Sequence, residues 1–356
     1  MKDMFGVEQA PVTVGRFELV RRLGSGAMGH VHEARGTNLE RSVALKLLGE
    51  GAWQRSIPRR DALIREAQSS ARLSHPNIVQ VYEVGIDGST VFIAMELVAG
   101  KNLQQWVDED APDWAEILFV LRQAGEGLAA AHDIGVTHRD FKPENILLEH
   151  RLAQPADTAP RLDKGVVGRV CVTDFGLARA GDELASPELA PTPERRGRSE
   201  CRRDDGLGPG TWAYLSPEHR CGPLTSHSDQ FSFCVTLHRA LFGRFPFPRG
   251  ADGRLVFDAA RGPTFPKEAH GIPSSVCQAI ERGLSIEPSK RHGDMRALLT
   301  ALDIERRPRR CTGALGALAL VAISSGMLMA TDRPTLIRGA DAGSWPQIDV
   351  VGSIDE

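Results

Sequence analysis

With 356 residues, of which 41% are hydrophobic, the chain can form one large two-lobed domain or two ordinary domains, and it is too apolar to be disordered. Its 43 basic and 46 acidic residues leave a net charge of −3, so the bulk charge does not indicate nucleic-acid binding. Six cysteines without a C-x-x-C pair or a metal-binding spacing with histidine are typical of free thiols in a reducing compartment.

The N-terminal part predicts a small β-sheet with one helix. Residues 1–16 form an N-terminal extension that lacks the apolar core of a signal peptide, so this part is expected to stay inside the cell. One helical stretch covers residues 60–73. The β-rich runs around it lie at residues 17–20, 42–47, 79–84 and 91–95. We therefore expect a sheet lobe over residues 17–98.

Longer periodic segments predict a mostly helical lobe over residues 99–304. The expected helices lie at residues 115–132, 229–242, 274–284 and 294–305. Residues 181–209 are dense in Pro, Ser, Thr, Arg and Glu, which predicts a long exposed loop.

The composition shifts twice after the helical lobe. Residues 305–310 contain four arginines, and residues 311–331 form an uncharged run of about the length that a membrane-spanning helix needs. The tail at residues 332–356 has five acidic residues and two arginines, so the positive-inside rule places the N-terminal domain in the cytoplasm and the tail outside. We expect a single-pass protein of the cell membrane; the alternative is a buried terminal helix of a soluble fold.

A glycine-rich stretch after the first strand indicates phosphate binding. Gly24, Gly26, Gly29 and Val31 fit the pattern G-x-G-x-x-G-x-V, in which absent side chains let backbone N–H groups approach phosphate oxygens. A dinucleotide-binding turn shares these glycines, but a helix begins at its last glycine. Residues 30–34 continue as a strand, which favours a hairpin.

A single cation interrupts an apolar strand further along the chain. Lys46 ends the run at residues 43–46, and Glu66 in the expected helix offers the opposite charge. The alternatives are a lysine that faces solvent and a glutamate that is merely solvated.

Two dense polar clusters each lie beside an apolar strand. Residues 138–145 read His-Arg-Asp-Phe-Lys-Pro-Glu-Asn, and residues 174–176 read Asp-Phe-Gly. With the glycine-rich stretch and Lys46, they resemble the signature motifs of the protein kinase family. The resemblance covers about residues 17–304 and includes residues 216–218 and Arg291. The pattern is most similar to bacterial Ser/Thr kinases of the eukaryote-like type, especially their single-span membrane members.

The resemblance implies an α+β fold of two lobes. A small antiparallel β-sheet with one helix would form the N-lobe, and a larger, mostly α-helical C-lobe would be followed by a single transmembrane helix. The implied cofactors are ATP and Mg²⁺, with Mn²⁺ as a substitute. The implied partners are protein substrates with Ser or Thr hydroxyls and the membrane, with a homodimer left open and no nucleic acid.

Roles for polar residues follow from the same resemblance. Asp140 would accept the proton of the substrate hydroxyl, and Thr211 would contact both Asp140 and Lys142. Lys142 lies where Ser/Thr kinases, unlike tyrosine kinases, place a lysine near the transferring phosphoryl group. Asn145 and Asp174 would bind the metal ions.

The nucleotide site is also implied by resemblance. Lys46, oriented by Glu66, would bind the α and β phosphates, Met95 would be the gatekeeper, and the backbone of Glu96 and Val98 would hold adenine. The full implied nucleotide-binding set is Gly24, Ser25, Gly26, Gly29, Val31, Ala44, Lys46, Met95, Glu96, Val98 and Leu147.

Control is expected to act through the long loop. Arg139 would pair with a phosphate on Ser186, Thr192 or Ser199, which predicts autophosphorylation; the alternative is a solvated insertion without regulatory effect. The expected function is an ATP-dependent serine/threonine protein kinase. The alternatives are a pseudokinase scaffold, a small-molecule kinase and a membrane-tethered binding module.

Overall fold

The computed structural model describes twelve stretches of the chain. They are residues 11–26, 29–36, 41–48, 64, 67–68, 70–152, 159–162, 165–175, 211–219, 223–258, 261–266 and 271–304. The chain separates into two compact units, Met1–Glu305 and Arg306–Glu356, and all described residues belong to the first.

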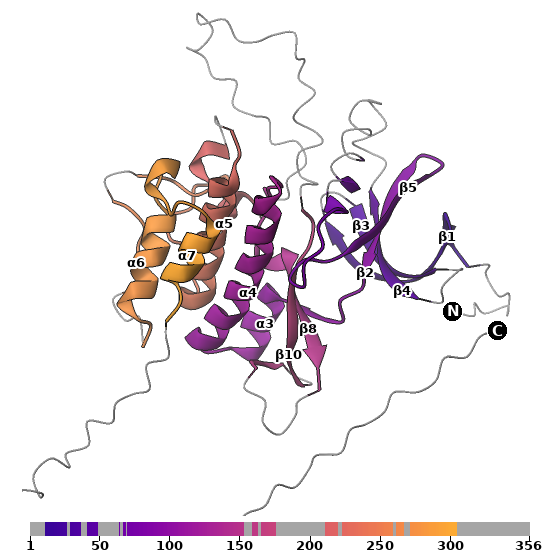
Figure 1. Ribbon diagram of the computed structural model, residues 1–356, viewed down its shortest axis with the longest axis horizontal. Coiled ribbons are helices and arrows are strands. Elements are labelled where there is room, and N and C mark those ends of the chain that lie inside the picture. Colours follow the sequence, from indigo (N-terminus) through magenta and orange to yellow (C-terminus); the bar gives the residue numbers. More distant parts are fainter. Residues whose placement is uncertain are drawn as a thin grey trace, which may run out of the picture. The chain divides into compact units, whose positions relative to one another are not determined.

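The N-terminal part forms a six-stranded antiparallel sheet in the order β1-β2-β3-β4-β6-β5 (Figure 1). Its strands are β1 (Thr13–Val14), β2 (Phe17–Gly26), β3 (Gly29–Gly36), β4 (Ser42–Leu48), β5 (Val81–Asp87) and β6 (Thr90–Glu96). Alternate residues of β4 enter different hydrophobic clusters, because successive strand side chains point to opposite faces. Val43 and Leu45 pack with Phe17 and Phe92, whereas Ala44 packs with Met95.

The C-terminal part combines a second sheet with helices. The sheet has the order β7-β8-β10-β9, formed by β7 (Gly100–Asn102), β8 (Ile146–Arg151), β9 (Arg161–Leu162) and β10 (Gly165–Val172). The α-helices are α3 (Leu103–Asp110), α4 (Trp114–Asp133), α5 (Ser226–Phe242), α6 (Ser274–Gly283) and α7 (Met295–Ala301). The 3₁₀-helices are η1 (Pro143–Asn145), η3 (Thr211–Tyr214), η4 (Pro217–His219) and η5 (Pro288–Lys290). β8 and β10 lie between the helices and the first sheet (Figure 1).

Local sequence explains where the helices begin and which faces they bury. Asp113 caps α4, because its carboxylate accepts the N–H groups of Ala115 and Glu116 at 2.8 Å. The Glu116 carboxylate in turn accepts the Asp113 N–H, which completes a capping box. Helix α5 is instead buried on all sides over residues 228–238, so it passes through the core.

The segment before β5 is fixed to the C-terminal part. The Asn77 side chain donates to the Val170 carbonyl at 2.8 Å, and its own carbonyl accepts the Val172 N–H at 2.9 Å. A Cβ atom on Gly127 of α4 would lie 2.5 Å from the Asn77 oxygen, so only glycine allows this approach. Asn77 therefore connects the two parts of the fold.

The structure corrects several expected boundaries. The strand expected at residues 79–84 is Val81–Asp87, because the Val79 N–H pairs with the Val172 carbonyl at 2.9 Å instead of with β6. The last helix is shorter than residues 294–305 and ends at Ala301. Helix α3 and strand β7 were not expected from the sequence.

Some expectations concern residues that the structure does not describe. Of the helix expected at residues 60–73, Ile64, Ala67, Gln68 and Ser70 are described and are helical, whereas residues 71–73 are described and are not, so the expected C-terminal boundary was too late. The expected loop at residues 181–209 and the expected membrane helix at residues 311–331 lie outside the described residues. Within the described part, no helix combines the length and hydropathy needed to cross a bilayer.

A buried ion pair connects η4 with the segment before α7. Arg291 has a fully buried side chain and binds both carboxylate oxygens of Glu218, at 2.7 and 2.9 Å. Arg291 also donates to the carbonyls of Ser285, His227 and Ile286. Burial acts to raise the pKa of Glu218, but the hydrogen bond and charge of Arg291 hold that pKa below its ordinary value.

Replacing Glu218 by glutamine leaves the Arg291 charge buried without a counter-ion, so we expect the free energy of unfolding at pH 7 to fall by roughly 3–5 kcal/mol. The depressed pKa of Glu218 gives the wild type a stability contribution that is complete above about pH 4.5 and is lost as the pH falls below it. Urea denaturation at several pH values measures both effects, and Glu218→Gln should remove this part of the pH dependence.

The matched control is Asp303→Asn, which breaks the exposed pair between Arg122 and Asp303. An exposed pair contributes about 1 kcal/mol or less, so this variant should stay close to wild type. Equal losses of unfolding free energy in the two variants would show that the buried Arg291–Glu218 pair contributes no more to stability than an exposed pair.

Candidate active site

The glycine-rich stretch is a hairpin between β2 and β3. Gly24 pairs with Val31, Ser25 with His30, and Gly26 with Gly29. A Cβ atom on Gly24 or Gly26 would meet nothing within 4 Å, so protein packing does not require glycine at either position. Glycine weakens a strand, so two glycines that packing does not require need another reason. The open space above Gly24 and Gly26 indicates close approach by a group from outside the chain.

Lys46 of β4 forms an ion pair across the two parts of the fold. Its side chain is 7% exposed, and its Nζ lies 2.8 Å from Oδ1 of Asp174, which follows β10. Burial acts to raise the pKa of Asp174, but the charge and hydrogen bond of Lys46, together with the charges of His138 and Lys142, hold the pKa below its ordinary value. Asp174 has φ +64°, a left-handed conformation that a non-glycine residue adopts at the expense of strain.

Asp140, Lys142 and Thr211 form one hydrogen-bonded group. The Lys142 ammonium lies 3.0 and 2.8 Å from the two carboxylate oxygens of Asp140. The same ammonium donates to the Thr211 hydroxyl at 2.7 Å, although Thr211 is far away in the sequence. Thr211 is buried at the start of η3, which fixes the position of the lysine. The group joins a carboxylate, a cation and a hydroxyl at one point.

Asn145 connects this group to the strand that precedes Asp174. Its side-chain amide donates to the Asp140 carbonyl at 2.8 Å, and its own carbonyl accepts the Thr173 N–H at 3.0 Å. The Asn145 side-chain oxygen and the Asp174 carboxylate therefore come from neighbouring backbone positions.

Asp229 of α5 holds the loop before Asp140. Its carboxylate is buried and accepts the backbone N–H groups of His138 and Arg139, each at 2.7 Å. His132 lies 2.8 Å from the same carboxylate. Arg139 has φ +68°, so these bonds stabilise a strained turn. Burial acts to raise the pKa of Asp229, but its hydrogen-bond and charge partners, His132 first among them, hold that pKa below its ordinary value.

His138 joins the loop to the residues around Asp174. Its Nε2 lies 2.9 Å from the Thr173 carbonyl, and its ring centre is 4.7 Å from that of Phe175. Burial lowers the pKa of His138, which favours the neutral imidazole. A neutral ring suits its place among the aromatic side chains of Phe141 and Phe175.

The residues expected to surround adenine share one hydrophobic cluster. Ala44 and Met95 belong to its buried members, and Val31, Val98 and Leu147 pack against it. Leu147 comes from β8, whereas the others come from the first sheet and the stretch that follows β6. The cluster therefore contains apolar groups from both parts of the fold.

Glu96 ends β6 and makes a second ion pair across the fold. Its carboxylate binds Arg169 of β10, which also donates to Glu149 at 3.2 Å. This contact fixes the stretch after β6, whose backbone was expected to hold adenine. Glu66 was also expected in the site, but it lies outside the described residues, as does Gly176 of the motif at residues 174–176.

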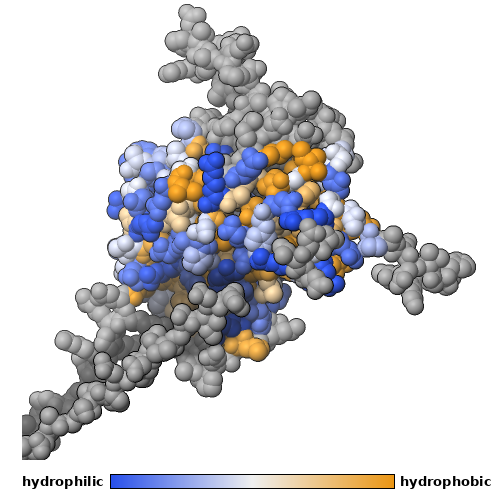
Figure 2. Space-filling view, turned by 45° about the vertical axis from the view of Figure 1, so that its right-hand side comes forward, coloured by the Kyte–Doolittle hydropathy of each residue, from blue (hydrophilic) through white to orange (hydrophobic). Residues whose placement is uncertain are grey.

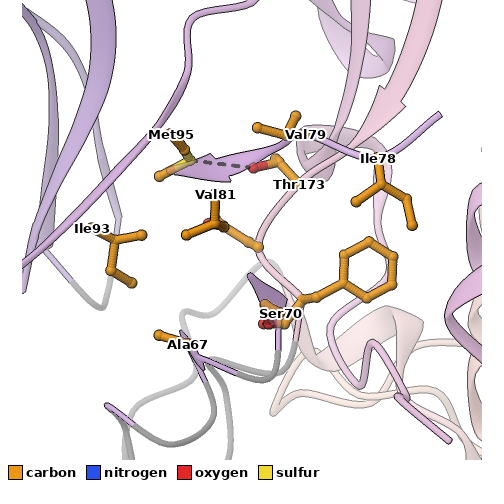
Figure 3. Close-up of a pocket in the computed structure, with 10 residues that line it drawn as sticks. Ala67, Ser70, Ile78, Val79, Val81, Ile93, Met95 and Thr173 are labelled. Carbon is orange, nitrogen blue, oxygen red and sulfur yellow. Dashed lines mark hydrogen bonds between the residues drawn. The ribbon is translucent and has the colours of Figure 1, made fainter. Parts of the chain in front are cut away.

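A cleft of about 380 Å³ continues from Asp174 to the space behind Met95 (Figure 3). Thr173 points its hydroxyl at the Met95 sulfur, at 3.8 Å. Small side chains at Ala67 and Ser70 form the opposite wall, and the Ser70 hydroxyl donates to the Phe175 carbonyl at 3.0 Å. The helix position of Ser70 is thus coupled to the residue after Asp174.

These residues fit a nucleotide with a divalent metal ion. The open space over Gly24 and Gly26 suits phosphates, the apolar cluster suits a base, and Lys46 supplies a cation. Asp174 and Asn145 offer oxygen ligands, which Mg²⁺ prefers. The described residues contain no group of three acidic, histidine or cysteine side chains arranged around a metal position. Mg²⁺ commonly binds one or two carboxylates together with phosphates and waters, so two protein ligands are adequate.

Sequence reasoning missed some residues on which the site depends. In the sequence His138 had no role beyond membership of the motif at residues 138–145, Asp229 was only the start of an expected helix, and Arg169 carried no prediction. A sequence signal for Asp229 existed, because it is an acidic residue shortly before the mostly apolar run at residues 231–237, where a carboxylate is rarely buried without a partner. The link from Arg169 to Glu96 had no local signal.

Comparison with known proteins agrees with this geometry. The family model described as protein kinase domain matches residues 17–301. Serine/threonine-protein kinase PrkC of Bacillus subtilis is 32% identical over 301 residues, which cover 82% of this chain and 41% of PrkC. Serine/threonine-protein kinase pkn2 of Myxococcus xanthus is 32% identical over 298 residues, covering 81% of this chain and 32% of that protein. The chain thus spans less than half the length of these curated relatives.

Solved structures share the arrangement of elements. The kinase domain of Mycobacterium tuberculosis PknI superposes with a TM-score of 0.59 at 22% identity, covering 83% of this chain and 98% of that one. Rad53 in complex with AMP-PNP gives a TM-score of 0.59 at 23% identity, covering 80% and 64%. At this identity the likeness shows the fold alone, which is the two-lobed protein kinase fold with an antiparallel N-lobe sheet and a helical C-lobe.

The opposing effects on Asp174 give a test of the site. In Lys46→Met the neutralising charge is gone while burial remains, so the pKa of Asp174 should move from below to above its ordinary value. A ¹³C NMR titration of the Asp174 carboxyl group in both proteins measures the shift. Titration below the ordinary value in Lys46→Met would mean that another group, and not Lys46, stabilises the carboxylate.

Proposed function

The chain belongs to the protein kinase family, and from that premise we propose that it transfers the γ-phosphoryl group of ATP to serine and threonine hydroxyls of proteins. The observation that carries the proposal is the group formed by Asp140, Lys142 and Thr211. It places a proton acceptor and a cation together, close to the Lys46–Asp174 pair through Asn145.

The chemistry requires positioning and charge stabilisation more than a covalent intermediate. Negative charge spreads over the γ-phosphate oxygens, and attacking and leaving oxygens must lie in line. Asp140 accepts a hydrogen bond from the substrate hydroxyl and takes its proton as the oxygen attacks. Asp140 keeps its orientation because Lys142 and Asn145 both donate to it.

Lys142 favours a serine or threonine kinase. Its ammonium lies beside the proton acceptor, where it can stabilise charge on the phosphoryl group during transfer. Thr211 holds that ammonium from the other side. The relatives described as serine/threonine-protein kinases support the same assignment.

Lys46 and the glycine hairpin would bind ATP. In the described structure the Lys46 ammonium is paired with Asp174, and bound phosphates would share that cation. Asp174 and Asn145 would hold Mg²⁺, for which Mn²⁺ would be a substitute; the bound ion would neutralise negative charge on the phosphates. The base would enter the cluster around Ala44, Met95 and Leu147.

Membrane anchoring and self-modification belong to the same proposal. The uncharged run at residues 311–331 would anchor the kinase domain to the cell membrane on its cytoplasmic side. Phosphates on Ser186, Thr192 or Ser199 would pair with Arg139 or nearby arginines of the loop. The homodimer stays a prediction based on resemblance.

Full-length protein should incorporate phosphate from ATP with Mg²⁺ into itself and into a protein substrate. Asp174→Asn and Lys46→Met should each lower kcat by ~10² or more, because each removes a charge that acts on the phosphates. Radiolabelled ATP measures the rate, and mass spectrometry maps phosphate within residues 181–210 with Asp140→Asn as the blank. Full activity in either charge variant would contradict the assigned roles, and an unmodified loop would exclude loop phosphorylation as the switch.

A pair of Thr211 variants serves as the matched control. Thr211→Val removes the hydroxyl at nearly constant shape and should lower kcat at least tenfold, because Lys142 loses its fixed position. Thr211→Ser keeps the hydroxyl and should retain most of the activity. Equal losses in the two variants would show that packing, not the hydroxyl, matters at this position.

The membrane proposal predicts that full-length protein sediments with membranes and resists carbonate extraction. A chain that ends before Arg306 should be released, since it lacks the apolar run. Release of the full-length chain by carbonate would instead indicate an interfacial or buried segment. The kinase assay is independent of this result.

A further inference from the structure

A group of arginines lies beside the segment that reaches the candidate active site. The segment is η3, which begins at Thr211 with its bond to Lys142 and ends at Tyr214. The Tyr214 hydroxyl accepts a hydrogen bond from Arg239 in the last turn of α5. A peptide that presents its hydroxyl to Asp140 therefore lies close to this arginine.

A cleft of about 390 Å³ is lined by residues of α3, η1 and the end of α5. Pro143 forms one wall and follows directly on Lys142. Arg239 and Gly243 of the α5 end and Asp108 of α3 also line it. Both carboxylate oxygens of Asp108 accept hydrogen bonds from the Gln104 side-chain amide, at 2.9 and 2.8 Å. The cleft thus begins next to the catalytic loop and contains a half-buried cation.

Two guanidinium groups gather on one aromatic ring. The Arg239 guanidinium lies 4.8 Å from the ring centre of Phe245, and that of Arg249 lies 5.2 Å from the same centre. Arg244 is exposed and precedes Phe245 in the chain. Within the described part of the chain, no carboxylate forms an ion pair with Arg239, Arg244 or Arg249.

The negative groups around these arginines do not balance them. The C-terminal end of α5 carries about half a negative charge. Burial raises the pKa of Tyr214, the charge of Glu144 in η1 also raises it, and the charges of Arg239 and Arg249 lower it. Glu144 is exposed. Arg239 and Arg249 lie beside this region, and the exposed Arg244 lies between them in the chain, so positive charge remains in excess. Arg291 of the same lobe, by contrast, is buried with a bidentate carboxylate.

Support of Tyr214 alone does not explain the group. A tyrosine hydroxyl needs one donor, which Arg239 supplies, whereas Arg244 and Arg249 are exposed and make no contact with that hydroxyl in the described structure. Crowding like charges around one ring is unfavourable unless an anion joins them. Figure 2 shows hydrophobic and hydrophilic residues intermixed on the visible face of the molecule.

We propose that the cluster of Arg239, Arg244 and Arg249 selects peptide substrates with an aspartate or glutamate within a few residues of the acceptor hydroxyl. The guanidinium fork matches a carboxylate, and the aromatic ring beneath it excludes water from one side of the contact. Arg239 is carried by a helix and fixed by Tyr214, so it is preorganised for binding. The inference rests on the proposed function and specifies its substrate class.

The experiment uses the full-length chain and a neutral serine peptide in which one aspartate is walked through four positions on either side of the serine. At one or two positions the aspartate should lower KM for the peptide about tenfold or more, with KM for ATP unchanged. Arg239→Gln and Arg249→Gln should each remove most of this gain, while activity on the neutral peptide stays within about twofold.

Three controls separate recognition from folding. Arg239→Lys keeps the charge and should retain part of the preference, and Arg239→Glu should turn it toward a lysine-containing peptide. Arg296→Gln removes an exposed arginine of α7 that pairs with Asp133 and Glu126, and it should behave as wild type. Equal loss on acidic and neutral peptides in the Arg239 variants would assign the cluster a structural role and overturn the proposal.

Binding measured by fluorescence anisotropy distinguishes this inference from the kinase proposal, because it requires no turnover. Tighter binding of the acidic peptide that is lost in Arg239→Gln supports the acidic site even if no phosphate is transferred. Equal binding of acidic and neutral peptides overturns it even if the kinase is active. The proposal is also overturned if a phosphoserine in the peptide tightens binding and an aspartate does not. A rise in activity on all peptides in Arg239→Gln would indicate that an internal segment occupies the cleft, and it too overturns the proposal.

Discussion

The buried carboxylate of Asp229 is the constraint on which the rest of the site depends. Arg139 adopts a left-handed conformation that costs roughly 1–3 kcal/mol in a non-glycine residue, and the turn forms only where its surroundings stabilise it. Asp229 supplies that stabilisation by accepting the N–H groups of His138 and Arg139 from a position inside α5. Because α5 passes through the core, the loop that carries Asp140 is attached to a buried helix of the C-lobe.

Further contacts spread this order toward the N-lobe. His138 connects the loop to Thr173 by a hydrogen bond and to Phe175 by a ring contact. Asp174, which lies between these two residues in the chain, forms the ion pair with Lys46. Asn77 and the Arg169–Glu96 pair tie the two lobes together at other points. The groups proposed to bind phosphate and metal thus come from both lobes but are held by bonds to a common set of backbone positions.

The same core helix also shapes the substrate side. The start of α5 fixes the loop before Asp140, and its end carries Arg239 beside Tyr214. Between them, η3 connects Thr211 of the catalytic group to Tyr214. Catalysis and recognition of an acidic peptide would therefore share one scaffold, and positions of acceptor and carboxylate relative to each other would be set by α5.

The sequence by itself determined the two-lobed fold class and singled out the residues proposed as catalytic, because motifs such as residues 138–145 combine residue types whose spacing is local. It also located most strands and helices, since their periodicity is visible within short windows. Only the tertiary structure decided that Asp174 pairs with Lys46, that Asp229 stabilises the Arg139 turn, and that Val79 pairs with β10 instead of β6. The arginine cluster near Tyr214 likewise had no sequence signal. These contacts join residues far apart in the chain, so they depend on how the lobes and helices pack, which local patterns do not encode.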